Sequence, residues 1–249
     1  MRSRKRDLAF SVFVFFVFFV ARPLIIAHRG ASAEAPENTL AAFRRALALK
    51  VDGIELDVQL TRDGVPVVFH DATLRRLTGA RGRLSAKTWL ELTALRIRGT
   101  EPIPRLVDVL RLTRGRVQVQ IELKADTAVA PVIAAIWAAR AASQVMLASF
   151  EPGLVRDALR LAPEVPRMLI TEGRARPSVL ARQLATLQAH GLSVNHRAVR
   201  AAAWVHNFQS RGYVVWGWTV NDAPTARRLA GWGIDGILGD NPALLQRAV

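Results

Sequence analysis

The sequence predicts one α/β domain of the (β/α)₈ TIM-barrel class, with a small insertion after its second strand. Three observations support this prediction. Short apolar runs alternate with amphipathic stretches from Pro23 to the C-terminus, and eight such runs can be counted. Eight strand–helix units are the number that closes a parallel sheet into a barrel. No linker divides the 249 residues, a length that one large domain can occupy.

The predicted strands are short apolar runs bounded by turn residues. They span residues 24–28, 53–58, 117–123, 145–149, 166–170, 192–195, 213–219 and 233–238. Apolar residues recur at helical spacing between them, for example in residues 39–50 and 223–232. An open doubly wound sheet would fit the same alternation, but the sequence lacks the Gly-rich turn with which such sheets bind dinucleotides. The closed barrel is therefore favoured.

One irregular stretch, from about Leu60 to Arg105, separates the second and third predicted strands. It contains "VPVVFHDATLRRLTG", then a polar segment, then "PIPRLVDVL". An insertion at the end of a barrel strand lies over the C-terminal face, where the active sites of such barrels are built. We therefore expect this insertion to form a wall of the site.

Residues 1–22 differ from the rest of the chain, because a basic head is followed by an uncharged apolar run from Leu8 to Ala21. Such a segment is typical of a signal peptide or a membrane anchor. As a helix, the fourteen-residue run would reach about 21 Å, short of a hydrocarbon core of about 30 Å, which favours a signal segment. A small-x-small cleavage site is missing before residue 22. We expect residues 23–249 to be exported or held at a membrane by this run, or to be cytoplasmic if translation starts near residue 22.

The formal charge of +15 raises the question of nucleic acid or an anionic membrane surface as a partner. The basic residues are mostly arginines scattered along the predicted helices, and no basic stretch in the body of the chain is interleaved with aromatic residues. Single-stranded nucleic acid would need such aromatic residues to stack on, so we expect no nucleic-acid partner. Cysteine is absent, which excludes disulfides and thiolate chemistry. The sequence gives no indication of the oligomeric state.

Charged residues fall at the C-terminal ends of the first three predicted barrel strands. They are His28 and Arg29 on the first strand, Glu55 and Asp57 on the second, and Glu122 and Lys124 on the third. Residues two apart on a strand point the same way. The second and third pairs therefore each face the barrel mouth, while the apolar residues between their members face the helices.

Three carboxylates that converge on one mouth repel each other, by roughly 4 kcal/mol for each pair about 4 Å apart at an effective dielectric constant near 20. A positive charge among Glu55, Asp57 and Glu122 must compensate this repulsion. An all-carboxylate set fits one hard divalent cation, Mg²⁺ or Ca²⁺, whereas zinc more often recruits His or Cys. The alternative is a buried ion network in which Glu55 and Asp57 pair with nearby arginines.

Two histidines, His28 and His70, accompany these carboxylates. Imidazole titrates close to neutral pH, so an acid and a base that flank a metal-bound phosphate suit phosphoester cleavage. Arg29 and Lys124 offer hydrogen-bond donors for the non-bridging phosphate oxygens. The three later histidines are interpreted as surface or loop residues.

Several stretches match a known family in order and at the usual separations. They are "IIAHRGASAEAPENTLAAF", "GIELDVQLTRDGVPVVFHDATLRRLTG", "IPRLVDVL", "IELK", "WGWTVND" and "GIDGILGDNP". Together they resemble the glycerophosphodiester phosphodiesterase family, from Pro23 to the C-terminus. Two departures from the family pattern, Gly239 before the final Asp-x-Pro and "LRRLTG" after the HD element, touch no metal or acid/base position. They bear on substrate preference.

The resemblance implies a (β/α)₈ barrel that uses a divalent metal to hydrolyse glycerophosphodiesters to an alcohol and sn-glycerol 3-phosphate. At the matching positions, it implies the metal ligands Glu55, Asp57 and Glu122, the acid/base pair His28 and His70, the phosphate contacts Arg29 and Lys124, and an apolar wall near the glycerol from Trp218. Asn38 of the ENT element is expected to cap the following helix.

The sequence leaves two questions of mechanism and activity open. We expect His28 to take the proton of the attacking oxygen and His70 to protonate the leaving alcohol, and both the neighbouring 2-hydroxyl and water fit as nucleophile. Two alternative functions are a lysophospholipase D that acts on membrane lysolipids and a membrane-attached barrel without activity.

Overall fold

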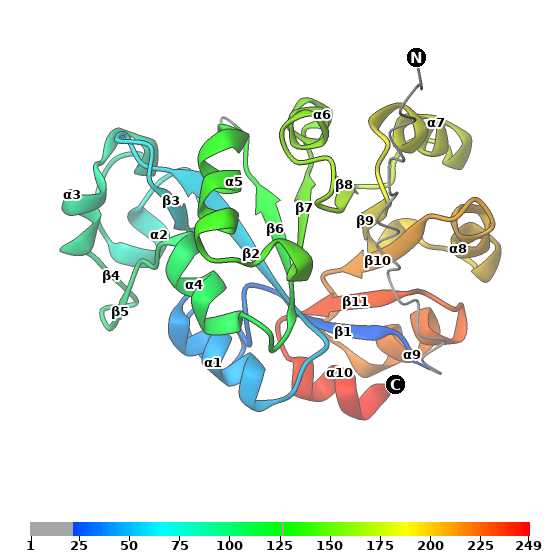
Figure 1. Ribbon diagram of the computed structural model, residues 1–249. Coiled ribbons are helices and arrows are strands. Elements are labelled where there is room, and N and C mark those ends of the chain that lie inside the picture. The colour runs from blue at the N-terminus through cyan, green and yellow to red at the C-terminus, as the bar shows by residue number, and fades with distance from the viewer. Residues whose placement is uncertain (1–21, 126) are drawn as a thin grey trace, which may run out of the picture.

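Eight parallel strands form a closed barrel in the computed structural model, which describes residues 22–125 and 127–249 (Figure 1). These strands are β1 (Leu24–Ala27), β2 (Gly53–Leu60), β6 (Gln118–Leu123), β7 (Val145–Ser149), β8 (Arg167–Thr171), β9 (Gly191–Asn195), β10 (Val214–Trp218) and β11 (Gly236–Gly239). Neighbours pair in this order, and β1 closes the ring because it pairs with both β11 and β2. The predicted (β/α)₈ barrel is confirmed.

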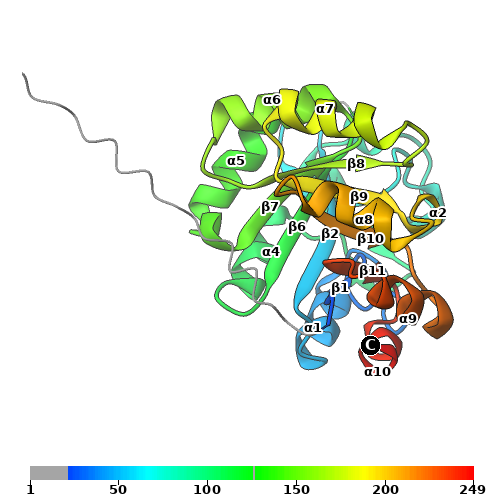
Figure 2. The ribbon, with the colours of Figure 1, turned by 90° about the vertical axis from the view of Figure 1, so that its right-hand side faces the viewer.

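One helix follows each barrel strand and lies on the outside of the ring, as Figures 1 and 2 show from two sides. The helices are α1 (Leu40–Ala48), α4 (Leu106–Thr113), α5 (Val129–Ala138), α6 (Pro152–Leu161), α7 (Pro177–Leu187), α8 (Ala202–Gln209), α9 (Ala223–Gly231) and α10 (Pro242–Ala248), and the short 3₁₀ helices η2 (Ala142–Gln144) and η3 (His196–Ala198) lie between them. Proline in the first turn starts α6, α7, α9 and α10, where its missing N–H costs nothing.

Apolar side chains fix the strands on both sides of the barrel wall. The residues that alternate with the carboxylates face the helices and are at most 1 % exposed: Ile54, Leu56, Ile121 and Leu123. A second set fills the barrel interior below the mouth: Ile26, Met146, Met168, Trp216 and Leu238. This apolar floor confines the polar residues of the strands to the open end of the barrel.

The predicted insertion is present beside the end of β2. It contains β3 (Pro66–Val68), which pairs antiparallel with β2, and then α2 (Arg75–Thr78), η1 (Leu84–Ala86), α3 (Trp89–Thr93), β4 (Arg96–Ile97) and β5 (Glu101–Pro102). Figure 1 shows α3 and β4 at the edge of the molecule, away from the ring. The insertion has an apolar core of its own: Val67, Phe69, Leu74, Leu77, Leu84, Leu92, Ile97 and Ile103.

Three predicted element boundaries are wrong by two or three residues. The last strand begins at Gly236 instead of residue 233, because Asp235 turns its carboxylate toward the backbone N–H of Val215 (2.7 Å). The second strand continues to residue 60, because β3 pairs with its end. The helix predicted for residues 39–50 ends at residue 48, and Lys50 takes a positive φ of 54°.

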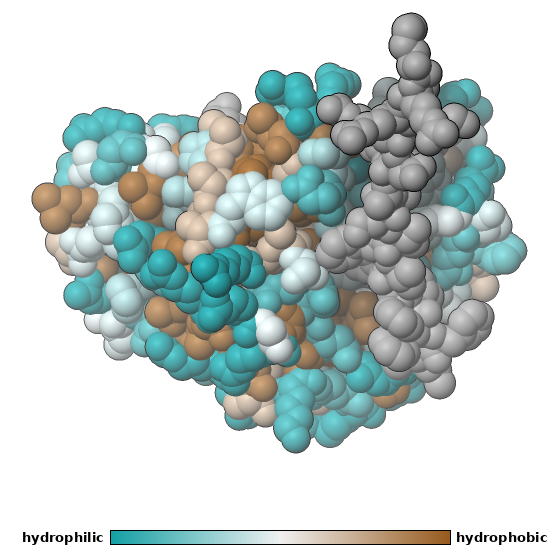
Figure 3. All heavy atoms as spheres, viewed as in Figure 1, coloured by the Kyte–Doolittle hydropathy of each residue, from teal (hydrophilic) through white to brown (hydrophobic). Residues whose placement is uncertain are grey.

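The predicted signal or anchor segment lies outside the described residues, apart from Arg22. The guanidinium of Arg22 pairs with Asp52 at 2.7 Å, directly before β1. No helix in the part of the chain that the structure describes combines the length and the apolar character that a membrane span requires. Hydrophilic side chains are spread over several parts of the face in Figure 3, with white and brown residues between them.

The turn after β1 requires glycine at position 30. Gly30 has a φ of +82°, and a Cβ at this position would lie 2.7 Å from the Cβ of Ala42 on α1. Because the loop passes so close to the helix, a larger residue would push it outward. Gly30 directly follows His28 and Arg29, so its conformation helps to set where these two side chains point.

We expect Gly30→Ala to lower the free energy of unfolding by more than the matched variant Gly64→Ala. Gly64 has a similar φ of +78° but open space around a Cβ, so its replacement should cost only the left-handed strain of about 1 kcal/mol. The clash at Gly30 should add roughly 1–3 kcal/mol. Urea denaturation of both variants measures the difference, and equal losses would contradict the role of the close approach.

Candidate active site

Three carboxylates meet at the C-terminal mouth of the barrel. Asp57 on β2 and Glu122 on β6 are partners in the strand register, and Glu55 lies one step below Asp57 on the same face of β2. One oxygen atom of each residue lies within 4.8 Å of the others. All three residues are buried: Glu55 is 3 % exposed, Asp57 1 % and Glu122 9 %. The structure thus brings the three predicted metal ligands together.

Two cationic side chains accompany this triad. Nζ of Lys124 lies 2.8 Å from Oδ1 of Asp57 and also pairs with Glu122, and Nε of Arg29 lies 3.3 Å from Oδ2 of Asp57. Glu55 instead accepts a hydrogen bond from the backbone N–H of Arg29 at 3.0 Å. Of the alternative, in which Glu55 and Asp57 pair with arginines, the described ranges contain only the pair of Asp57 with Arg29, whereas no Lys or Arg side chain there pairs with Glu55.

The pKa values of the triad diverge because the positive charge is unevenly shared. Burial and the repulsion from Asp57 and Glu122 raise the pKa of Glu55 well above its ordinary value. Burial and the negative charge of Asp57 raise the pKa of Glu122 to about 7, although Lys124 opposes the shift. Burial alone would also raise the pKa of Asp57, but Lys124 and Arg29 hold it well below its usual range.

These residues fit a hard divalent cation. All three candidate ligands offer carboxylate oxygens, the donors that Mg²⁺ and Ca²⁺ prefer. With all three carboxylates ionised, their charge exceeds that of Lys124 and Arg29 by one negative charge; this excess, which the raised pKa values of Glu55 and Glu122 reflect, would oppose the binding of a phosphate diester. A divalent cation would change the balance to one positive charge, which is the sign that a monoanionic diester requires.

Each of the two predicted histidines is held by a carboxylate. Nδ1 of His28 lies 2.7 Å from Oδ1 of Asp240, and Nδ1 of His70 lies 2.7 Å from Oδ1 of Asp71. A carboxylate accepts, so Nδ1 carries the proton and Nε2 is left for a ligand. Nε2 of His28 lies 4.0 Å from Oε2 of Glu55, at the edge of the triad.

The two supporting aspartates were not assigned a role in the sequence-based prediction. Asp240 also accepts hydrogen bonds from the hydroxyl of Ser32 (3.1 Å) and the amide of Asn221 (2.6 Å). Burial alone would raise the pKa of Asp240, but the hydrogen bond from its histidine and these donors lower it to about 2. Hydrogen bonds from Arg76, at 2.6 and 2.8 Å, lower the pKa of Asp71 to about 2. Both carboxylates are therefore ionised at neutral pH.

A further set of contacts links the insertion to the loop after β1. Glu37 accepts hydrogen bonds from Arg76 (2.7 Å) and from Arg29 (2.8 Å). Asn38, expected to cap α1, instead donates its amide N–H to Oδ2 of Asp57 at 2.7 Å, and Thr39 caps the helix. The prediction for Asn38 is wrong because its positive φ of 58° directs it away from the helix and toward the triad.

Glu55, Glu122 and the two histidines line a cavity of about 190 Å³, and Asp57 lies buried beside these carboxylates. Trp218, predicted as an apolar wall, also lines it, and its ring meets that of Phe150 edge-on with centroids 5.6 Å apart. The amide of Gln120 lines the cavity at 2 % exposure, and neither its oxygen nor its nitrogen has a hydrogen-bond partner among the described residues. Since burying unpaired polar atoms is costly, this amide is available to a ligand or to water.

Acid/base groups beside a cation site, with donors for phosphate oxygens, suit the cleavage of a phosphate ester at the C-terminal face of a barrel. The fold and the cavity therefore define a TIM-barrel phosphoesterase. The comparisons with known proteins specify the family. The model of the glycerophosphoryl diester phosphodiesterase family matches residues 28–244, and the chain belongs to this family of phosphoric diester hydrolases.

Relatives from several bacteria support this assignment. A glycerophosphodiester phosphodiesterase from Caldanaerobacter subterraneus is 34 % identical over 239 residues, which are 90 % of this chain and 96 % of the relative. The structure of an Oleispira antarctica phosphodiesterase in complex with the product sn-glycerol-3-phosphate is 28 % identical, with a TM-score of 0.84 over 92 % of this chain and 98 % of that one. A glycerophosphodiester phosphodiesterase from Agrobacterium tumefaciens is 30 % identical, with a TM-score of 0.80 over 90 % and 99 %.

We expect Mg²⁺ or Ca²⁺ to raise the unfolding temperature of the wild-type protein but not that of Glu55→Gln. At a hundredfold excess over the dissociation constant, binding should stabilise the fold by about 2.7 kcal/mol, or roughly 5–10 °C for a chain of this size. Without metal, Glu55→Gln should not lower the unfolding temperature, because it removes a buried repulsion. Differential scanning fluorimetry measures both effects.

The matched control is Glu172→Gln, which changes a carboxylate in the same cavity but outside the triad. This variant should keep the metal-induced shift. A shift that persists in Glu55→Gln, or that disappears in Glu172→Gln, would contradict the assignment of the triad.

Proposed function

We propose that the protein hydrolyses glycerophosphodiesters to an alcohol and sn-glycerol 3-phosphate, using one divalent cation and two histidines. Family membership and the product bound to the Oleispira neighbour support this choice of substrate. One observation carries the proposed mechanism. His28 and His70 line a single cavity with Glu55 and Glu122 of the triad, and a carboxylate holds each of them through Nδ1.

Glu55, Asp57 and Glu122 would hold the cation, Mg²⁺ or Ca²⁺. When bound, it supplies Lewis-acid stabilisation of the charge on the phosphate. Lys124 and Arg29 pair with Asp57 of the triad. Once the triad is compensated, their N–H groups can turn to the non-bridging phosphate oxygens, which accept charge-assisted hydrogen bonds.

The two histidines divide the proton transfers. His28 takes the proton of the attacking oxygen through Nε2, and both the 2-hydroxyl of the glycerol and water fit as nucleophile. His70 gives a proton to the alcohol oxygen as the bond between that oxygen and phosphorus breaks. Burial lowers the pKa of the His70 imidazole, so its protonated form releases the proton more readily. Asp240 and Asp71 keep the proton of each ring on Nδ1.

The direct test is the release of sn-glycerol 3-phosphate from glycerophosphocholine and glycerophosphoglycerol by the full-length protein. A coupled assay with glycerol-3-phosphate dehydrogenase should detect turnover with Mg²⁺ or Ca²⁺, loss of turnover with a chelator, and recovery when metal is added back. Release of free glycerol and phosphocholine from glycerophosphocholine would show cleavage of the other ester bond. Absence of turnover would overturn the proposed function.

We expect His70→Ala to lose about 10²- to 10⁴-fold in kcat on glycerophosphocholine while it keeps the metal-induced rise in unfolding temperature. The loss should be much smaller on the p-nitrophenyl ester of glycerol 3-phosphate, because nitrophenolate leaves without a proton. The control His206→Ala removes an exposed histidine of α8 and should leave both rates unchanged. An equal loss of His70→Ala on both substrates would contradict its role as the acid.

A further inference from the structure

A second hollow of about 260 Å³ lies beside the cavity that is lined by Glu55, Glu122 and the two histidines. Its wall includes Gln59 of β2, Arg83 and Ser85 of the insertion, and Thr127 after β6. The two hollows share only His70 and Lys124 among the described lining residues. A ligand that extends into both must therefore pass these two side chains.

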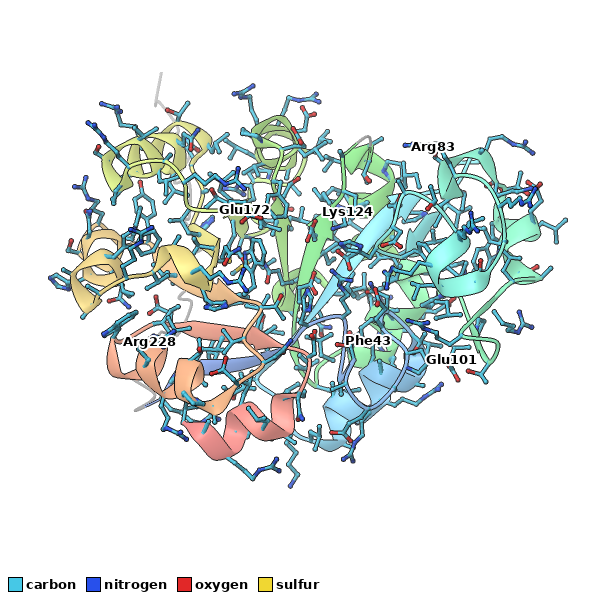
Figure 4. All side chains as sticks on the ribbon, turned by 180° about the vertical axis from the view of Figure 1, so that it is seen from behind. Phe43, Arg83, Glu101, Lys124, Glu172 and Arg228 are labelled. Atoms are coloured by element: carbon cyan, nitrogen blue, oxygen red, sulfur yellow. The ribbon has the colours of Figure 1, made fainter. Side chains whose placement is uncertain are left out.

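The position of the shared residues matches the shape of a phosphodiester. Such a substrate carries two alcohol arms on one phosphate. His70 and Lys124, the groups placed to protonate the leaving oxygen and to contact the phosphate, lie where the hollows meet. Figure 4 shows Lys124 between Glu172, which lines the first cavity, and Arg83, which lines the second hollow. With the phosphate at this junction, one arm enters each side.

The first cavity fits the arm that all glycerophosphodiesters share. The unpartnered amide of Gln120 and the hydroxyl of Ser193, at 2 % and 1 % exposure, lie on buried strand positions of its lining. Glu172 adds a carboxylate, which the amide of Asn195 orients at 2.9 Å. Buried hydrogen-bond donors and acceptors in fixed positions suit the hydroxyl groups of glycerol, which are the same in every glycerophosphodiester.

The second hollow differs in charge and in construction. Arg83 supplies a positive charge, Lys124 lies at the shared wall where it pairs with Asp57 and Glu122, and no carboxylate is among the described lining residues of the second hollow. Arg83 is exposed, and its guanidinium has no ion-pair or hydrogen-bond partner in the part of the chain that the structure covers. A guanidinium of this kind binds a carboxylate or a phosphate through two parallel hydrogen bonds, whereas it repels a quaternary ammonium group.

We propose that the second hollow receives the variable alcohol arm of the substrate and that Arg83 favours alcohols that carry a negative charge. This inference rests on the proposed function. It names the class of preferred substrates, which are glycerophosphodiesters whose alcohol bears a phosphate or a carboxylate. Choline, with its fixed positive charge, is disfavoured at the same position.

The test compares kcat/KM of the full-length, metal-loaded enzyme on two substrates. Bis(glycerophospho)glycerol carries a second phosphate on its alcohol arm, and glycerophosphocholine carries a cation. We expect the wild type to prefer the former. Arg83→Gln should lower the ratio of the two kcat/KM values about threefold and Arg83→Glu about tenfold, the effect of removing or reversing one exposed charge contact.

Arg81→Glu is the matched control, because this substitution changes the net charge as much as Arg83→Glu does. Arg81 is exposed in the same loop and lies outside both described linings. The control substitution should leave the ratio at the wild-type value. Equal ratios for Arg83→Glu and the wild type, or equal decreases for Arg83→Glu and Arg81→Glu, would overturn the inference. Unfolding temperatures of all variants show that they are folded.

A further variant distinguishes the two possible placements of the arms. With glycerol in the first cavity, Glu172→Gln should lower both rates by the same factor. A change of the substrate ratio in Glu172→Gln without one in Arg83→Glu would place the variable arm in the first cavity and overturn the inference. In that case, release of sn-glycerol 3-phosphate by the wild type would still support the proposed function. Absence of any wild-type turnover would overturn both the proposed function and this inference.

Discussion

The structure of the site depends on the meeting of three carboxylates on two neighbouring strands. Asp57 and Glu122 are register partners, and strand alternation directs Glu55 to the same mouth. The apolar residues between them are packed against the helices, so the strands cannot rotate to release the carboxylates without exposing Ile54 and Leu56. Buried charges of one sign persist only with compensating charge nearby. The positions of the cationic side chains follow from this constraint, and the proposed divalent cation would meet the same requirement.

A chain of charged contacts extends this constraint from the triad to the insertion. Individually exposed ion pairs contribute little to stability, but linked charge-assisted hydrogen bonds fix the relative positions of the groups they join. The loop after β1 and helix α2 are joined in this way across the mouth of the barrel. The chain runs from His70 through Asp71, Arg76, Glu37 and Arg29 to Asp57. His70, the proposed acid, is thereby positioned relative to the carboxylates through the insertion.

The barrel and the triad could be predicted from the sequence because both depend on short-range patterns, namely the alternation of apolar runs and the spacing of two between Glu55 and Asp57. The contact of His28 with Asp240 could not be predicted in this way, because it arises only when β1 pairs with β11 and closes the ring. Alternation alone also does not show that Gln120 lies unpaired in the cavity instead of facing solvent. The departure at Gly239 has a local cause that sequence comparison does not reveal, since a Cβ there would collide with the carbonyl oxygen of Val220.

The insertion has eight buried apolar residues of its own and joins the barrel sheet through β3. A segment that supplies its own core can change in length and composition while the ring of eight strands keeps its shape. Arg83 and Ser85 lie on this segment, whereas the carboxylates and His28 lie on the ring and the loop after β1. Evolution can therefore change the residues around the proposed alcohol arm by remodelling the part of this segment that lies beyond His70 and Asp71, while the carboxylates and His28 stay on the ring.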